Sequence, residues 1–220
     1  MDDKYAAARR AMVNTIRRYG VQDKRVLNAL LSVPRHLFVP KHLQHCAYAD
    51  HPLPIGHGQT ISQPYIVALM TELLLLRGNE RVLEIGTGSA YQAAVLSLLC
   101  KEVYTIEFVK QLCEEAKERL KRLGYRNVHV RCGDGYFGWK EAAPFDAVII
   151  TCGTPRIPHP IIEQTKEGGR IVAPVGDPPD DLVLTRFTKT KRGLKKETFG
   201  GVLFVPMRGK VERRSSNHNR

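Results

Sequence analysis

From residue 81 onward, short apolar runs alternate regularly with amphipathic segments, and this alternation constrains the fold more than any other feature of the chain. The strand-like runs cover residues 82–85, 103–106, 128–130, 145–151 and 171–173. The helix-like segments between them cover residues 90–99, 110–123 and 160–166. Strands and helices that alternate at this spacing predict an α/β fold with a mostly parallel sheet and helices on both faces. Two more apolar stretches, 182–187 and 202–205, flank a basic turn and are candidates for an antiparallel pair.

The first third of the chain has a different texture. Residues 5–19 and a segment that begins after Asp23 have helical periodicity, and Asp23 suits the N-cap of the second helix. Residues 34–61 are rich in Pro, Gly and His and predict mostly loop. A further helix is expected from Pro64 to residue 76. We therefore expect an N-terminal helical extension and substrate-side loop over residues 1–62, and a core with C-terminal strands over 63–220, in one compact domain.

Composition narrows the class of protein. No apolar run approaches the roughly 20 residues that cross a bilayer, and the N-terminus has no hydrophobic leader, so we expect a cytoplasmic protein that does not enter membranes. The five cysteines are scattered, odd in number and form no Cys-x-x-Cys pair. This pattern predicts reduced thiols, with neither a disulfide framework nor a metal site.

The net charge of +12 gives the surface a positive field. Residues 185–220 contribute eleven Lys and Arg against two Asp and Glu. Such a region attracts nucleic acid or carboxylate-rich peptides, or it is simply a pair of solvated strands and a basic tail. We favour the second interpretation, because no aromatic platform for bases stands out. The composition of residues 210–220 predicts a tail without ordered structure.

A glycine-rich loop, Glu-Ile-Gly-Thr-Gly-Ser-Ala at residues 84–90, follows the first strand of the alternating region. Its glycines let the backbone approach a ligand at the carboxyl end of a parallel strand. The dinucleotide fingerprint fails because Tyr91 stands where its third glycine belongs, and a P-loop lysine is absent. Glu107 closes the second strand about 20 residues later, where an acid accepts hydrogen bonds from ribose hydroxyls. Gly133-Asp134-Gly135 follows the third strand, so polar groups collect at successive strand ends.

The loop resembles the first motif of S-adenosylmethionine-dependent methyltransferases, acidic-x-Gly-x-Gly-x-Gly, with Ala90 in place of the last glycine. We expect this replacement to cost little if residue 90 lies within the following helix. The resemblance implies a Rossmann-like methyltransferase fold, S-adenosyl-L-methionine as cofactor and S-adenosyl-L-homocysteine as product. In that pattern the acid at position 134 faces the adenine amino group. The residues expected to bind the cofactor are Thr60, Ile61, Glu84, Gly86, Thr87, Gly88, Ser89, Glu107, Gly133, Asp134 and Gly135.

The segment Leu-Pro-Ile-Gly-His-Gly-Gln-Thr-Ile-Ser-Gln-Pro-Tyr at residues 53–65 narrows the resemblance to one family. It is similar to the segment that precedes the cofactor domain in protein-L-isoaspartate(D-aspartate) O-methyltransferases, in their bacterial form. The similarity extends over about residues 20–206 and includes 81–92, 133–135, 144–150, 167–170 and 204–206. The sequence departs from the family pattern at His57, at residues 152–154 and at Arg208. Arg208 could alter contacts with the cofactor or a peptide.

The resemblance implies an enzyme that methylates the α-carboxyl of L-isoaspartyl residues in damaged proteins and peptides. The ester then closes to a succinimide, which can reopen to normal aspartate. A carboxylate is already ionised near neutral pH, so the remaining work is positioning rather than base catalysis.

In the family, Ser62 is the catalytic residue, and we expect its hydroxyl to orient the substrate carboxylate with help from backbone amides around residues 63–66. Taken from the residues alone, Ser62 could equally be the N-cap of the next helix, and the two roles are compatible.

Two other interpretations remain open on the sequence. A methyltransferase acting on RNA or a small molecule would use the same cofactor fold, but residues 151–155, Thr-Cys-Gly-Thr-Pro, lack an Asn-Pro-Pro-Tyr-like motif. A module that binds without turnover is disfavoured by the presence of Ser62, Glu107 and Asp134. We expect a monomer that binds isoaspartyl proteins and no nucleic acid, with residues 201–205 offering backbone groups to an extended peptide.

Overall fold

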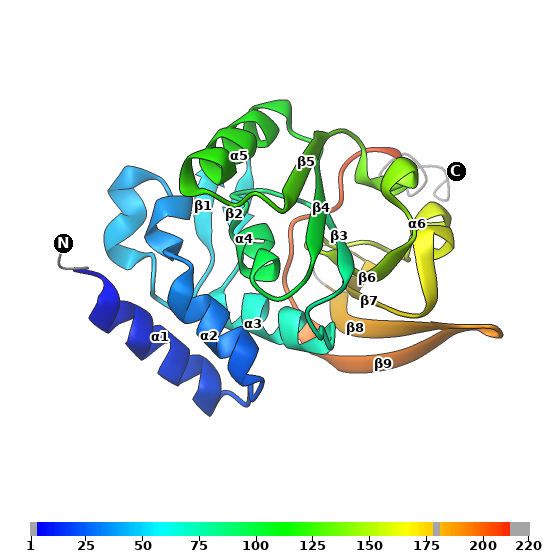
Figure 1. Ribbon diagram of the computed structural model, residues 1–220, viewed down its shortest axis with the longest axis horizontal. Coiled ribbons are helices and arrows are strands. Elements are labelled where there is room, and N and C mark those ends of the chain that lie inside the picture. The colour runs from blue at the N-terminus through cyan, green and yellow to red at the C-terminus, as the bar shows by residue number, and fades with distance from the viewer. Residues whose placement is uncertain (1–3, 178–180, 212–220) are drawn as a thin grey trace.

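The computed structural model describes residues 4–177 and 181–211, and its centre is a seven-stranded sheet (Figure 1). The strand order is β5-β4-β3-β6-β7-β8-β9. The pairs β5–β4, β4–β3, β3–β6 and β6–β7 are parallel, whereas β7–β8 and β8–β9 are antiparallel. The predicted mostly parallel sheet is therefore confirmed. The strands are β3 Arg81–Ile85, β4 Glu102–Glu107, β5 Val128–Cys132, β6 Phe145–Ile150, β7 Thr165–Asp177, β8 Asp181–Thr190 and β9 Gly193–Val202.

Helices cover the sheet from both sides, as the alternation predicts. In chain order they are α3 Pro64–Leu73, α4 Tyr91–Ser97, α5 Lys110–Leu123 and α6 His159–Gln164. The sheet separates two apolar cores, and α4 contributes to one of them and α6 to the other. Along β6, Ala147 and Ile149 enter the first core while Val148 and Ile150 enter the second. Burial on both faces explains why this strand reads as one continuous apolar run.

The N-terminal extension packs as two helices, α1 Ala6–Arg18 and α2 Lys24–Ser32, at the edge of the molecule beside α3 (Figure 1). The predicted cap is confirmed, because the Asp23 side chain accepts a hydrogen bond from the Arg25 amide at 2.8 Å. The segment 34–61 is more regular than predicted. It forms two 3-10 helices, η1 Arg35–Phe38 and η2 Lys41–Cys46, and a hairpin of β1 Leu53–Gly56 and β2 Gln59–Ile61. These elements are too short to give a hydrophobic period, which is why the sequence pattern did not reveal them.

The C-terminal antiparallel pair exists, but its second strand lies earlier than predicted. β9 pairs with β8 from Gly193 to Val202, and residues 203–205 fall outside it. Most β9 side chains are exposed, so the strand has no buried alternation and is held to β8 by its backbone. Figure 1 shows this hairpin reaching outward from the sheet. Residues 212–220, the greater part of the predicted basic tail, lie outside the described residues.

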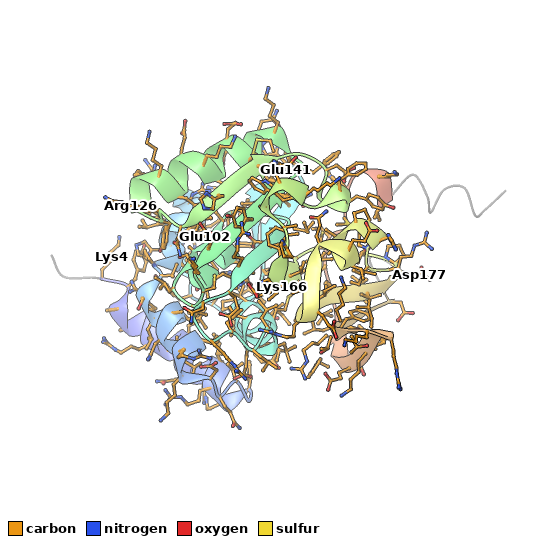
Figure 2. All side chains as sticks on the ribbon, turned by 45° about the vertical axis from the view of Figure 1, so that its right-hand side comes forward. Lys4, Glu102, Arg126, Glu141, Lys166 and Asp177 are labelled. Atoms are coloured by element: carbon orange, nitrogen blue, oxygen red, sulfur yellow. A yellow bond between two sulfur atoms is a disulfide. The ribbon has the colours of Figure 1, made fainter. Side chains whose placement is uncertain are left out.

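Figure 2 shows the exposed side chains of Lys4 and Arg126 pointing away from the ribbon. Within the described ranges, no helix is long and apolar enough to cross a membrane.

The prediction that the cysteines are reduced thiols is wrong for one pair. Cys113, in the first turn of α5, and Cys132, the last residue of β5, form a disulfide across a sequence separation of 19 residues. Spacing along the chain gave no sign of this bond, because it depends on α5 packing against β5. Cys46, Cys100 and Cys152 are free.

Candidate functional site

The glycine loop begins where β3 ends, and its backbone takes conformations that favour glycine. Gly86 and Gly88 have φ values of +99° and +51°. A Cβ atom on Gly86 would lie 2.6 Å from Thr151 Oγ1, closer than real contacts allow. The same Thr151 hydroxyl lies 2.7 Å from the Gly86 carbonyl oxygen and 3.0 Å from that of Ile85. The end of β6 thus holds the loop in place while the missing side chains keep its backbone exposed to a ligand.

Ala90 does not lie within the helix, so the condition under which we expected its replacement of glycine to cost little is not met. It is the N-cap of α4 and has φ +68° and ψ 12°, in the left-handed region. An alanine pays roughly 1–2 kcal/mol for that conformation. The loop therefore extends one residue further than the pattern suggested, and the alanine methyl group is fully buried beside it.

Glu107 connects the end of β4 to the glycine loop. Its Oε2 accepts a hydrogen bond from the Gly88 amide at 2.7 Å, and its Oε1 accepts one from the Val109 amide at 2.9 Å. Each carboxylate oxygen has two lone pairs, so both oxygens retain capacity to accept from a ligand hydroxyl. The acid that the sequence placed at the second strand end thus shapes the loop as well as facing the cavity.

Glu84, the acid of the loop motif, lies beneath the loop rather than facing the cavity. It is 0% exposed, and neither carboxylate oxygen has a hydrogen-bond partner among residues 4–177 and 181–211. Burial raises the pKa of this carboxyl to about 8, against the opposing influence of the nearby Thr105 hydroxyl and with a further contribution from the charge of Glu107. Glu84 is therefore mostly protonated at neutral pH.

Asp134 is turned toward the backbone of its neighbours. Its Oδ1 accepts from the Tyr136 amide and its Oδ2 from the Lys210 amide, both at 2.9 Å. The carboxylate thereby caps the 3-10 turn η3 Gly135–Phe137 and fixes the C-terminal segment beside it. Gly133 donates its amide to the Glu107 carbonyl at 2.8 Å. The adenine contact expected for Asp134 remains a prediction.

One cavity opens above the loop, and we call it the loop cavity. Among the residues named from the sequence, it is lined by Thr60, Ile61, Ser62, Gly86, Thr87, Gly88, Ser89, Glu107 and Gly135, whereas Glu84, Gly133 and Asp134 do not line it. Sequence reasoning missed several wall residues, including Phe108, Val109, Cys152 and Met207, whereas Arg208, for which it allowed a contact with the cofactor or a peptide, does line the cavity. The sequence did offer a signal for Phe108, an aromatic residue directly after the strand-end acid Glu107. In the structure Phe108 is 48% exposed. Residues 205–208 reach the cavity only through the tertiary fold.

Ser62 lies in the short link between β2 and α3. The helix begins at Pro64 and its N-cap is Gln63, so Ser62 is not the cap that the sequence allowed. The Ser62 side chain is half-buried, and its hydroxyl forms no hydrogen bond with any residue in the described ranges. Its carbonyl oxygen accepts a hydrogen bond from Arg35 Nη2 at 2.8 Å. The main chain of Ser62 is therefore held from behind while its hydroxyl stays free.

Asp50 occupies the N-terminus of α3 that we expected to bind the substrate anion. It accepts from the Tyr65 amide at 2.9 Å and from Gln63 Nε2 at 2.8 Å. A carboxylate in this position satisfies the helix dipole and repels a second anion. The predicted help from these backbone amides is thus wrong for Tyr65.

A second depression, which we call the strand groove, adjoins the loop cavity. Its lining comes from the residue after α1, from β2 and the start of α3, from β8, and from the end of β9 with the segment that follows. The residues that it shares with the loop cavity are Thr60, Ser62, Thr151, Val205 and Pro206. Among the described residues that line the groove, Asp181 is the only one that is an Asp, Glu, Lys or Arg. Leu203 is 80% exposed on its wall. The Val205 carbonyl accepts from Gly153 at 2.8 Å, so the backbone of residues 201–205 is only partly free to pair with a peptide.

The strand order and this cavity define a class of protein. A glycine loop at the carboxyl end of the central strand β3, joined to the acid that ends β4, is the arrangement in which methyltransferases hold S-adenosylmethionine. Gly86 and Gly88 line the loop cavity without side chains, so a ligand there can lie against their backbone. The protein has the fold of the S-adenosylmethionine-dependent methyltransferases.

Comparison with known proteins gives the particular family. Residues 7–212 match the family model of protein-L-isoaspartate(D-aspartate) O-methyltransferase. The chain is 56% identical over 208 residues to protein-L-isoaspartate O-methyltransferase 2 of Shewanella sediminis, covering 94% of this chain and 85% of the relative. It is 52% identical over 206 residues to the Dictyoglomus thermophilum enzyme, with coverages of 94% and 93%. The chain belongs to the protein-L-isoaspartate O-methyltransferase family.

Solved structures agree with this assignment. A protein-L-isoaspartate O-methyltransferase superposes with a TM-score of 0.83 at 31% identity, over 94% of this chain and 69% of that one. A Plasmodium falciparum chain described as a member of the same family, in complex with S-adenosyl-L-homocysteine, gives a TM-score of 0.78 at 25% identity, with coverages of 90% and 97%.

Proposed function

We propose that this enzyme methylates the α-carboxyl of L-isoaspartyl residues with the Ser62 hydroxyl as the group that orients the substrate carboxylate. The observation that carries this role is the position of that hydroxyl. It lies where the loop cavity and the strand groove meet, and it has no hydrogen-bond partner within the described residues. A half-buried donor without a partner is ready to bind an incoming acceptor.

A neutral donor suits this chemistry. The substrate carboxylate is ionised at neutral pH and is itself the nucleophile. A buried cation would hold it more tightly, but it would also withdraw the negative charge that must attack. The described residues that the loop cavity and the strand groove share include Thr60, Ser62 and Thr151, which carry hydroxyls, and no Lys or Arg; Arg208 lines the loop cavity alone. This part of the site therefore supplies orientation, which is the main requirement for an in-line transfer.

The cofactor fits the loop cavity. The exposed backbone at Gly86 and Gly88 would lie against it, and the remaining lone pairs of Glu107 would accept from its ribose hydroxyls. Phe108 is placed to cover a flat ring at the cavity edge. When bound, S-adenosylmethionine supplies the methyl group and an uncharged sulfide as leaving group. The protein's own residues contribute position and exclusion of water.

The strand groove is suited to an extended peptide. β9 is the last strand of the sheet, so one of its edges faces outward beside this groove. Backbone contacts at Gly201 and Val202 and apolar contact with Leu203 would depend little on the peptide's sequence. Such a surface is appropriate for an enzyme that must accept many sequences around one abnormal linkage.

Transfer of labelled methyl to a short peptide tests the proposal. The peptide carries L-isoaspartate, and the same peptide with normal aspartate runs beside it. We expect methylation of the isoaspartyl peptide alone. In Ser62→Ala, loss of one hydrogen bond to a charged group should lower kcat roughly 10- to 100-fold, while cofactor affinity by calorimetry stays the same.

Ser32→Ala is the matched control, because it removes an exposed hydroxyl that bonds to the Asn28 carbonyl, far from the cavity. It should leave kcat unchanged. Failure of a folded, cofactor-binding protein to methylate the isoaspartyl peptide would refute the activity. Full kcat in Ser62→Ala would refute the role of the serine alone.

A further inference from the structure

Arg35 is a buried cation outside both depressions. It begins η1, is 0% exposed and heads the fully buried side chains by volume. It lines neither the loop cavity nor the strand groove, so it does not touch the ligands of either. The family assignment and the sequence motifs give it no task.

Three groups surround its guanidinium. Nε donates to the Ala47 carbonyl at 2.8 Å, and Nη2 donates to the Ser62 carbonyl at 2.8 Å. The guanidinium carbon lies 4.8 Å from the centre of the Tyr91 ring. Tyr91 is the first residue of α4 and lines the loop cavity. One rigid planar group therefore links the main chain of Ser62 to the first residue of the helix that follows the glycine loop.

The burial of Arg35 without an ion-pair partner among the described residues is energetically unfavourable. No carboxylate in the described ranges forms an ion pair with Arg35, and Nη1 has no hydrogen-bond partner there. Desolvation lowers the pKa of Arg35 to about 10, a value at which it is still charged in neutral solution. Burying such a charge costs several kcal/mol, and an apolar side chain of similar volume would often be more stable. Stability alone therefore does not account for an arginine at this position.

The contact with Ser62 does account for it. Directly after Ser62, the Asp50 carboxylate accepts hydrogen bonds from the Gln63 side chain and from the Tyr65 amide. Arg35 thus holds the Ser62 carbonyl and Asp50 holds the residues that follow it, while the serine hydroxyl forms no hydrogen bond within the described residues. Since the transfer needs oxygen, carbon and sulfur in line, a displacement of about 1 Å at the orienting group can cost on the order of 100-fold in rate.

We infer that Arg35 is a positioning residue for methyl transfer, which holds the Ser62 main chain at a fixed place against α4. This inference rests on the proposed role of Ser62. Arg35 acts on the rate through the serine hydroxyl and contributes nothing of its own to cofactor binding.

A double-mutant cycle between Arg35→Met and Ser62→Ala tests the inference. We expect Arg35→Met to lower kcat for the isoaspartyl peptide roughly 10- to 100-fold at saturating substrates, and by no more than Ser62→Ala does, with the cofactor Kd within about threefold of wild type. In the Ser62→Ala background the same substitution should lower kcat by less than about threefold, because the group that Arg35 positions is already gone. Arg35→Lys keeps the charge but not the two-pronged geometry and should show a smaller loss that also vanishes in that background.

The matched control is Arg9→Met. Arg9 donates to the Tyr48 hydroxyl at 3.2 Å and to the Leu31 carbonyl at 3.1 Å, and its guanidinium lies 5.6 Å from the Tyr48 ring. Arg9→Met should lower the melting temperature without lowering kcat at a temperature where the variant is folded.

Equal kcat losses for Arg35→Met in wild type and in the Ser62→Ala background would overturn the inference while leaving the role of Ser62 intact. Unchanged kcat in Ser62→Ala would overturn both. If Arg35→Met does not fold, the Arg35→Lys cycle decides by the same criteria.

Discussion

Protonation of the buried Glu84 makes the stability of this protein depend on pH in an unusual direction. The pKa of the carboxyl is about 8 in the folded protein, against an ordinary value of 4.5 in the unfolded chain, and burial is the main cause. Between these values the folded state holds a proton that the unfolded state has released. Unfolding then releases a proton, so the free energy of unfolding falls as pH rises.

The size of the effect follows from the two pKa values. Each pH unit well inside the window is worth about 1.4 kcal/mol, so the contribution of Glu84 should change by about 3–4 kcal/mol between pH 5 and pH 8. The isosteric Glu84→Gln variant cannot titrate and should lack this contribution. Its buried amide has its own desolvation cost, but that cost does not vary with pH. The difference in unfolding free energy between variant and wild type should therefore grow in favour of the variant as pH rises.

Urea denaturation followed by circular dichroism at pH 5, 6, 7 and 8, at constant ionic strength and without cofactor, measures this difference. Glu118→Gln, an exposed substitution on α5, is the control and should run nearly parallel to wild type. Other titrating groups are common to all three proteins and cancel. Parallel curves for Glu84→Gln and wild type would show that the carboxyl ionises normally and would refute the assignment of a buried, protonated acid.

Two further changes follow from contacts in the site. Glu107→Gln should weaken cofactor binding about 10-fold or more in calorimetry. The glutamine amide nitrogen would face the backbone N–H of Gly88 or Val109, where a carboxylate oxygen now accepts a hydrogen bond. An unchanged Kd would exclude Glu107 from the cofactor site. Reduction of the bond between Cys113 and Cys132, or Cys132→Ser, should lower the free energy of unfolding by about 3 kcal/mol, since a closed loop of this length removes that much chain entropy from the unfolded state. Identical urea midpoints with and without reductant would show that the bond does not form in solution.

The conformation of the glycine loop shows how far a sequence pattern determines a site. The pattern placed the loop at the end of β3, and it placed Glu107 at the end of β4, because glycine freedom and strand periodicity are local properties. It could not show that Ala90 adopts a left-handed conformation, since alanine carries no such preference. The buried residues at the start of α4 pack closely around Ala90 and hold it in this unfavourable conformation.

The sequence by itself determined the alternation of strands and helices, the mostly parallel sheet, the extent of the helix over residues 110–123, the glycine loop and the family. These features are encoded within a few consecutive residues, where turn chemistry and hydrophobic period operate. Only the tertiary structure decided which residues meet. It brought Arg35 to the Ser62 carbonyl across 27 positions, joined Cys113 to Cys132, and carried residues 205–208 into the wall of the loop cavity. Such contacts depend on how the elements pack, and packing is a property of the whole chain that no short segment contains.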